Sequence, residues 1–250
     1  MRKGNTANAR ECALSVLVAC RRNGAWADAA LKAQLGKCAL SAQDAALCSR
    51  IVYGVMQNEL LLNWYLSAYC TQKLDHLQPP LSDILRIGAY QILFLDKVPD
   101  HAAVSESVEL CRTNGRSAAS GLVNAVLRKA CSYDLSTASF KNEVERLMVL
   151  GSAGRDVAEF LHKNYPDEAL DILTYKADGG MTSLRANPLK GSADELCAKL
   201  LASGAKEAKR GIVPGSVLAR FEGSPAENEL FRQGYFHVEG QASQLAALCV

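Results

Sequence analysis

The sequence has no long apolar run, and this absence excludes a membrane-spanning protein. Its 250 residues contain no stretch of roughly 18 consecutive apolar residues, the length that a bilayer requires. The basic start, Met1 to Thr6, is not followed by the apolar core of a signal peptide. We therefore predict a cytoplasmic protein that makes no membrane contact.

Paired cysteines are also absent. Nine cysteines are scattered along the chain without any C-x-x-C spacing, and the four histidines do not lie near paired cysteines. A structural zinc site needs four clustered ligands, so no metal is expected. An odd, scattered set fits a reducing compartment better than a disulfide framework. We therefore expect free cysteines that pack as small apolar side chains.

Aromatic residues are few, and neither sign of charge dominates. Aromatics make up 6% of the chain, which leaves little for stacking platforms under unpaired bases. The formal net charge is +2, with 15 basic against 11 acidic residues in 1–134 and 13 against 15 in 135–250. A basic excess in the first half is compatible with RNA binding but does not require it.

What the first half does contain is helical periodicity. Apolar residues recur at helical spacing from Thr6 to about Ser132, most strongly between Leu81 and Leu95. Pro79-Pro80 marks the start of that helix, and Asn114-Gly115 is a C-cap signal for the next one. Ser41 with Asp44 is typical of a helix N-terminus. We predict six or seven helices in an orthogonal bundle.

The second half changes in character along its length. A polar stretch at 132–139 is followed by helical patterns over 140–177. Beyond them, three strand-like segments (182–188, 217–221 and 235–238) alternate with helices at 194–202 and 227–233. This alternation predicts a small α+β unit, for which an RRM-like sheet is one candidate. The fold class is therefore mainly α, with an α+β unit after the bundle.

Several segments of the bundle carry a family resemblance. Ile84 to Leu95, Val98 to Leu110 and Gly121 to Lys129 are similar, in order and spacing, to the NusB-like RNA-binding fold. The resemblance covers roughly residues 6–132. A coincidental helical bundle is the alternative, since each segment alone is an ordinary amphipathic helix.

Two later segments resemble a particular methyltransferase family. Phe231 to Leu245 is similar to the opening motif of the methyltransferase domain in the RsmB (Fmu/Sun) group, although Glu239-Gly240 replaces the usual Gln-Asp. Leu184 to Pro188 resembles a segment that precedes that domain. The resemblance implies the N-terminal region of a 16S rRNA cytosine-C5 methyltransferase. It divides the chain into a NusB-like domain (1–135), a helical linker (136–178), an α+β unit (179–233) and the start of a methyltransferase domain (234–250).

The chemistry that the resemblance implies has no counterpart in this sequence. The family uses S-adenosylmethionine and two cysteines in Pro-Cys and Thr-Cys contexts, one of which attacks C6 of cytosine. None of the nine cysteines here follows Pro or Thr, and no G-x-G-x-x-G loop occurs. Gly179-Gly180 follows a helical pattern and is interpreted as a turn. We therefore predict no catalytic, cofactor-binding or metal-binding residue in this chain; the cofactor would belong to the parent protein.

The expected partner is small-subunit ribosomal RNA. Basic residues off the apolar stripes are the candidate phosphate contacts, although any one of them is more often an ordinary solvated side chain. The candidates are Arg2, Lys3, Arg10, Arg112, Arg116, Arg128, Lys129, Arg185 and Lys190, with Lys209 and Arg210 as further basic residues of the second half.

Two other hypotheses remain open. One is a non-enzymatic NusB-like transcription antitermination factor, against which residues 133–250 argue because such factors are essentially the bundle alone. The other is a purely structural helical scaffold, which would bind no RNA in a salt-dependent manner.

Overall fold

The computed structural model describes residues 8–70, 72, 74–77, 80–175 and 180–249. Within it the chain forms two compact units, Met1–Thr174 and Tyr175–Val250. The four-part division at 135, 178 and 233 stays a prediction. No helix in the described ranges is both long and apolar enough to cross a bilayer.

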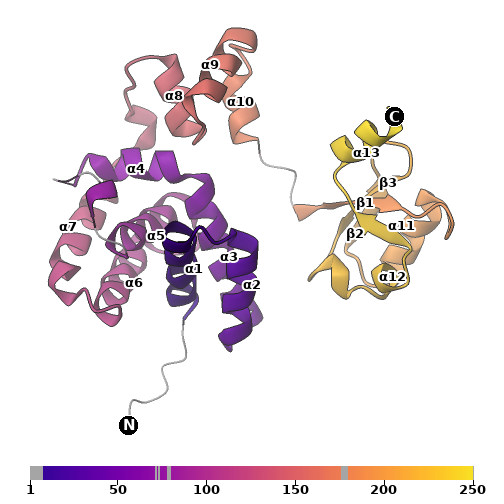
Figure 1. Cartoon of the computed structure of the whole chain (residues 1–250), viewed down its shortest axis with the longest axis horizontal. Helices are drawn as coiled ribbons and strands as arrows, with labels where there is room; N and C mark the ends of the chain where they lie inside the picture. The colour runs from indigo at the N-terminus through magenta and orange to yellow at the C-terminus, as the bar shows by residue number, and fades with distance from the viewer. Residues whose placement is uncertain (1–7, 71, 73, 78–79, 176–179, 250) are drawn as a thin grey trace. The chain divides into compact units, whose positions relative to one another are not determined.

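The first unit is built around one central helix. Helix α5 (Leu81–Phe94) packs against α1, α3, α4, α6 and α7, and its residues 82–91 are all buried. The bundle helices are α1 (Ala9–Asn23), α2 (Ala27–Lys37), α3 (Ala42–Gln57), α4 (Glu59–Ser67), α6 (Asp100–Thr113) and α7 (Ser120–Ala130), with short turns η1 (Leu74–His76) and η2 (Ser117–Ala119). Figure 1 shows these helices gathered in one body, so the predicted helical bundle is confirmed.

The helix ends follow the sequence signals. Ser41 Oγ accepts a hydrogen bond from the Asp44 amide at the start of α3, as its spacing predicted. Helix α6 ends at Asn114, and Gly115 takes a left-handed φ of +71°, which glycine adopts without strain. The start of α1 has a full capping box between Asn8 and Glu11, which the sequence analysis had not singled out.

The expectation that every cysteine is free was wrong. Cys12 of α1 and Cys38, the C-cap of α2, are joined in a disulfide. Helices α1 and α2 pack side by side, which brings together two residues 26 positions apart in the sequence. No local spacing marks that pair. The other seven cysteines are free.

A small helical subdomain packs on the bundle within the first unit. It comprises η3 (Leu135–Thr137), α8 (Glu143–Leu150), α9 (Arg155–Asn164) and α10 (Ala169–Thr174). Its own core is only Leu147, Ala158, Leu161 and Ala169. Helix α8 contacts α4, and the Trp64 and Phe140 rings lie 5.1 Å apart. So few apolar side chains cannot hold three helices alone, and packing on α4 completes their burial.

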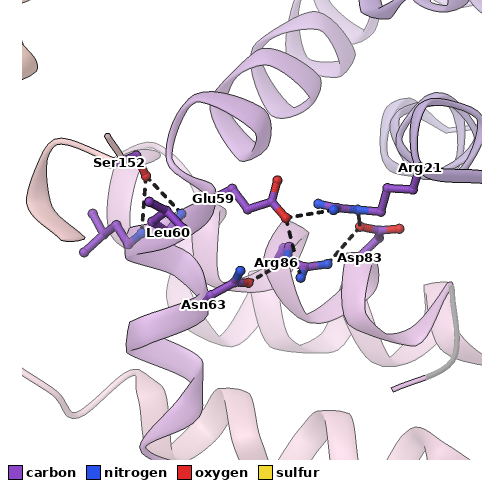
Figure 2. A network of polar contacts seen from close by, with 8 residues as sticks. Arg21, Glu59, Leu60, Asn63, Asp83, Arg86 and Ser152 are labelled. Carbon is purple, nitrogen blue, oxygen red and sulfur yellow. Dashed lines mark hydrogen bonds and ion pairs between the residues drawn. The ribbon is translucent and has the colours of Figure 1, made fainter. Parts of the chain in front are cut away.

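Ser152, between α8 and α9, supplies the missing N-cap of α4. Asn58 precedes that helix without a side-chain cap. Instead, Ser152 Oγ accepts the amide hydrogens of Leu60 at 3.0 Å and Leu61 at 3.3 Å. Figure 2 shows Ser152 beside Leu60. Ser152 has a φ of +47°, a backbone conformation that costs a serine energy. The cap therefore joins segments about 90 residues apart.

We expect Ser152→Ala to lower the free energy of unfolding by roughly 1 to 2 kcal/mol, because it removes a helix cap. Ser152→Gly removes the same hydroxyl but relieves the positive φ, so its loss should be smaller. Urea unfolding measures both, and hydrogen exchange should show faster exchange of the Leu60 and Leu61 amides. Unchanged protection of these two amides in both variants would contradict the capping role.

The second unit is a four-stranded antiparallel sheet in the strand order β2-β3-β1-β4. Along the chain its elements are β1 (Thr182–Ala186), α11 (Ala193–Ala202), β2 (Glu207–Arg210), β3 (Ser216–Arg220), η5 (Pro225–Glu227), α12 (Glu229–Arg232), β4 (Phe236–Val238) and α13 (Gln241–Leu248). The succession β-α-β-β-α-β with this order is the split βαβ arrangement. The predicted α+β unit is confirmed, and its four-stranded sheet matches the RRM-like candidate.

The two faces of this sheet differ. Leu184, Val217 and Ala219 point to one face and pack against Leu196 and Leu200 of α11. The intervening residues point to the other face, part of which α13 covers. There the Gln244 side-chain amide donates to the carbonyl oxygens of Leu184 and Glu239. Strand β2 was not predicted, because its sequence, Glu-Ala-Lys-Arg, has no apolar alternation and lies at the sheet edge.

Candidate nucleic-acid interface

A groove of about 760 Å³ runs along α6 and α7 in the first unit. Two of the candidate phosphate contacts line it, Arg112 in the last turn of α6 and Arg128 in the last turn of α7. Both point outward because the apolar stripes of their helices, including Leu110 and Leu127, are buried in the core. Cations in the last turn of a helix are also favoured by the helix dipole.

The groove has mixed charge. Asp100, Glu106 and Glu109 line it together with the two arginines, and Asn124 adds an uncharged amide. Arg112 and Glu109 form an ion pair at 3.5 Å, and both side chains are more than half exposed, at 58% and 61%. Such an exposed pair contributes little energy, so an incoming phosphate can replace the carboxylate.

Arg10 is positioned differently from the other candidates. Its Nε donates to the Gln91 side-chain oxygen at 2.7 Å, and its Nη1 lies 3.6 Å from Glu106. The side chain is only 16% exposed. Arg10 therefore joins α1 to α5 and α6, and its role in RNA binding stays a prediction.

The remaining first-unit candidates do not line the same groove. Arg116 lines a second hollow of about 450 Å³ with His76 and Gly115. Lys129 is exposed on α7 but outside the groove. Arg2 and Lys3 lie outside the described residues.

Arg185 and Lys190 lie in the second unit. Arg185, on β1, forms an ion pair with Glu239 at 3.5 Å. The Lys190 Nζ lies 5.6 Å from the centre of the Tyr235 ring. Sequence reasoning missed Lys199, whose Nζ lies 4.4 Å from the same ring. Only the packing of α11 on the sheet brings Lys199 close to Tyr235, so no local signal could have identified this contact.

The sheet face opposite α11 carries no aromatic side chain on the central strands. Its residues there are Ser183 and Arg185 of β1 and Ser216, Leu218 and Arg220 of β3. RRM domains stack bases on aromatics of this face. This sheet therefore resembles an RRM in topology without aromatic side chains on this face of its central strands.

The cysteine thiols of the described residues are poorly suited to nucleophilic attack. Burial raises the pKa of the Cys48 thiol to about 11, and burial also raises the pKa of Cys70 and Cys111. The same is true of Cys20, Cys131 and Cys197. Near neutral pH these groups are thiols, whereas the thiolate is the attacking form. Within the described ranges no group of His, Cys, Asp and Glu side chains could hold a metal ion.

One strand–loop–helix segment with an intervening glycine does not fit S-adenosylmethionine. That glycine is Gly191, between β1 and α11. The start of α11 is already satisfied by a capping box, in which Ser192 Oγ accepts from the Glu195 amide and Glu195 accepts from the Ser192 amide. A Cβ at Gly191 would overlap the Glu195 carboxylate, which lies against this glycine. No methyl-transfer step is derived from these residues.

A family model described as the NusB family matches residues 7–132, half of the chain and almost all of the bundle. The chain belongs to the NusB family. This match confirms the resemblance that the helix segments between Ile84 and Lys129 indicated.

Similarity to two relatives extends through both units of this NusB-family chain. It is 28% identical over 244 residues to the Bacillus subtilis "Probable ribosomal RNA small subunit methyltransferase B", covering 95% of this chain and 53% of that protein. It is 26% identical over 217 residues to the Escherichia fergusonii "Ribosomal RNA small subunit methyltransferase B", covering 82% and 47%. The chain thus spans about half the length of these relatives. The homology to RsmB-type enzymes that the later motifs indicated is confirmed.

A solved structure shares the architecture of this NusB-family chain. The crystal structure of PH0851 superimposes with a TM-score of 0.68 and 19% identity, covering 99% of this chain and 56% of that one. At this identity the likeness shows the fold alone.

Proposed function

We propose that this chain is the RNA-binding region of an S-adenosylmethionine-dependent small-subunit rRNA cytosine-C5 methyltransferase, and that it positions rRNA for a catalytic domain outside these residues. One observation carries the proposal: 95% of the chain aligns with a relative named for methylating small-subunit rRNA, while filling only 53% of that relative. The alignment continues through the α+β unit, which favours this function over an antitermination factor that is essentially the bundle alone.

The groove along α6 and α7 is the proposed RNA contact of the first unit. Arg112 and Arg128 converge there from the ends of two neighbouring helices. Contacts of this kind bind phosphates and orient the RNA without specifying its sequence. The carboxylates that share the groove limit how many phosphates it accepts. Binding should therefore be modest in strength and strongly dependent on salt.

The chemistry is proposed to belong to the rest of the parent protein. Six free cysteine thiols have raised pKa values and are protonated near neutral pH, and the start of α11 is closed by its own capping box. We expect isothermal titration calorimetry to detect no S-adenosylmethionine binding by these 250 residues. Micromolar binding would contradict this part of the proposal.

Replacing both groove arginines by glutamine should weaken RNA binding roughly tenfold at 0.1 M salt, because each lost phosphate contact removes about 0.7 from the log–log salt slope for single strands. Fluorescence anisotropy with a labelled small-subunit rRNA hairpin at several salt concentrations measures both the affinity and its salt slope. The matched control is Arg146→Gln with Arg155→Gln, two exposed arginines paired with glutamates on α8 and α9.

The control variant should bind within about twofold of the unsubstituted chain, since it removes the same charge outside the groove. Equal losses in both variants would mean that general charge alone attracts RNA. No salt-dependent binding of the unsubstituted chain would contradict the proposed function itself and favour a structural scaffold.

A further inference from the structure

Two segments of the second unit are fixed side by side at one end of the sheet. They are the loop that follows β1 and the segment that leads into β4. The Asn187 amide donates to the Tyr235 carbonyl at 2.9 Å, and the Asn187 side-chain amide donates to the Gly234 carbonyl at 2.8 Å. Asn187 Oδ1 in turn accepts from the Leu189 amide at 3.0 Å, which holds the loop itself. These hydrogen bonds hold the two segments together.

Two lysine side chains approach one aromatic ring at this end of the sheet. The Nζ atoms of Lys190 and Lys199 lie 5.6 and 4.4 Å from the centre of the Tyr235 ring. We call Lys190, Lys199 and Tyr235 the lysine–tyrosine cluster. Two ammonium groups sharing one ring repel each other, and the ring's attraction for each is modest at an exposed site. A bound anion would offset that repulsion.

The cluster has no carboxylate of its own. Within the described residues neither lysine forms an ion pair with an acidic side chain. Glu195 lines the same hollow as both lysines and accepts the Ser192 amide at 2.9 Å, so one carboxylate lies near two ammonium groups. By contrast, Lys206 of the same unit is paired with Glu222 at 2.9 Å. The two lysines therefore exceed the nearby carboxylate by one positive charge, which a bound phosphate would balance.

A hollow of about 350 Å³ adjoins the cluster. Asn187, which lies beside the two lysines and Tyr235, also lines this hollow. Arg185, Pro188 and His237 are among the residues that line it. Its size is at the lower end of small-ligand pockets. An amide, an imidazole and an apolar proline ring suit the base or sugar of one nucleotide, whose phosphate would lie against the lysines.

We propose that the lysine–tyrosine cluster and this hollow bind one unpaired nucleotide of a single-stranded RNA segment. The lysines contact its phosphates, and the hollow receives the sugar or base. The inference rests on the proposed function, and it adds a second RNA contact in a unit whose central strands carry no aromatic side chain on the face opposite α11. A base enters the hollow only if it is unpaired, so duplex RNA is excluded.

The test uses the whole chain and two labelled RNAs, a single strand and its duplex. Lys190→Gln with Lys199→Gln should weaken single-strand binding roughly tenfold at 0.1 M salt and lower the salt slope by about 1.4, the value for two phosphates. Duplex binding should change less than about twofold. The matched control is Lys206→Gln with Arg232→Gln, two exposed cations paired with glutamates in the same unit.

Three results would overturn the inference. One is single-strand binding by the lysine variant that equals that of the control variant. Another is an equal loss on duplex RNA. The third is displacement of RNA from the unsubstituted chain by inorganic phosphate at constant ionic strength, which would indicate a site for free phosphate. If the groove arginines still matter in any of these cases, the proposed function stands; if the unsubstituted chain binds no RNA, both fail.

Discussion

Asp83→Ala should lower the free energy of unfolding by about 3 to 5 kcal/mol, the largest effect that we expect from one substitution. Asp83 is fully buried on α5, and its carboxylate accepts hydrogen bonds from Arg21 Nε and, at 3.2 Å, from Arg86 Nη1. Arg86 is itself only 2% exposed. Figure 2 shows how Asp83 lies between the two guanidinium groups. Removing it leaves the buried Arg86 cation with less compensation, and urea unfolding measures the loss.

The rest of the network decides how this effect is tested. Arg86 also contacts Glu59 at 3.7 Å and donates to Asn63 Oδ1 at 2.8 Å, which cannot replace a buried carboxylate. Adding Arg86→Met to the Asp83 variant removes the buried charge that is then less well compensated, so much of the stability should return. Glu159→Ala, which breaks an exposed pair with Arg155, should cost less than about 1 kcal/mol. A loss this small from Asp83→Ala would contradict the role of the network.

Gly54→Ala should lower the free energy of unfolding by about 1 to 3 kcal/mol, although alanine is ordinarily the better helix former. Gly54 lies on α3 where that helix meets α5, and a Cβ there would overlap the ring of Tyr90. That ring cannot easily move, because Tyr90 is 6% exposed and stacks on Phe94 at 5.2 Å. Thermal and urea unfolding should both show the loss.

Gly36 on α2 provides the matched control for this substitution. It is exposed, and no atom lies within 4 Å of the place where its Cβ would stand. Gly36→Ala should therefore stabilise the chain by up to about 1 kcal/mol through helix propensity alone. If both glycine variants were stabilised, the close approach of α3 and α5 at Gly54 would not matter for stability.

The local features of the fold were readable from the sequence. The apolar period between Leu81 and Leu95 predicted α5, and Asn114-Gly115 predicted the end of α6, because helix periodicity and capping act within a few residues. The strand-like segments 182–188 and 217–221 likewise predicted β1 and β3. The charged strand β2 was not predicted, because it forms only by pairing with β3 along the edge of the sheet.

Features that depend on distant residues were not readable. The Cys12–Cys38 pairing and the engagement of Arg10 with Gln91 and Glu106 arise from helix packing. The same holds for the candidate site, because composition marks Arg112 and Arg128 as basic but only α6 packing on α7 places them in one groove. Lys199 became a candidate only through its contact with Tyr235.

The Ser152 hydroxyl caps a helix of the NusB domain, although Ser152 itself lies outside the range that the family model matches. The NusB family model ends at residue 132, yet the start of α4, inside that range, is completed by a side chain 20 residues beyond it. A NusB domain of this type separated at 132 would leave two backbone donors at Leu60 and Leu61 to find water instead. The α8–α10 segment thus stabilises the start of α4 through this cap as well as through the packing of α8 on that helix.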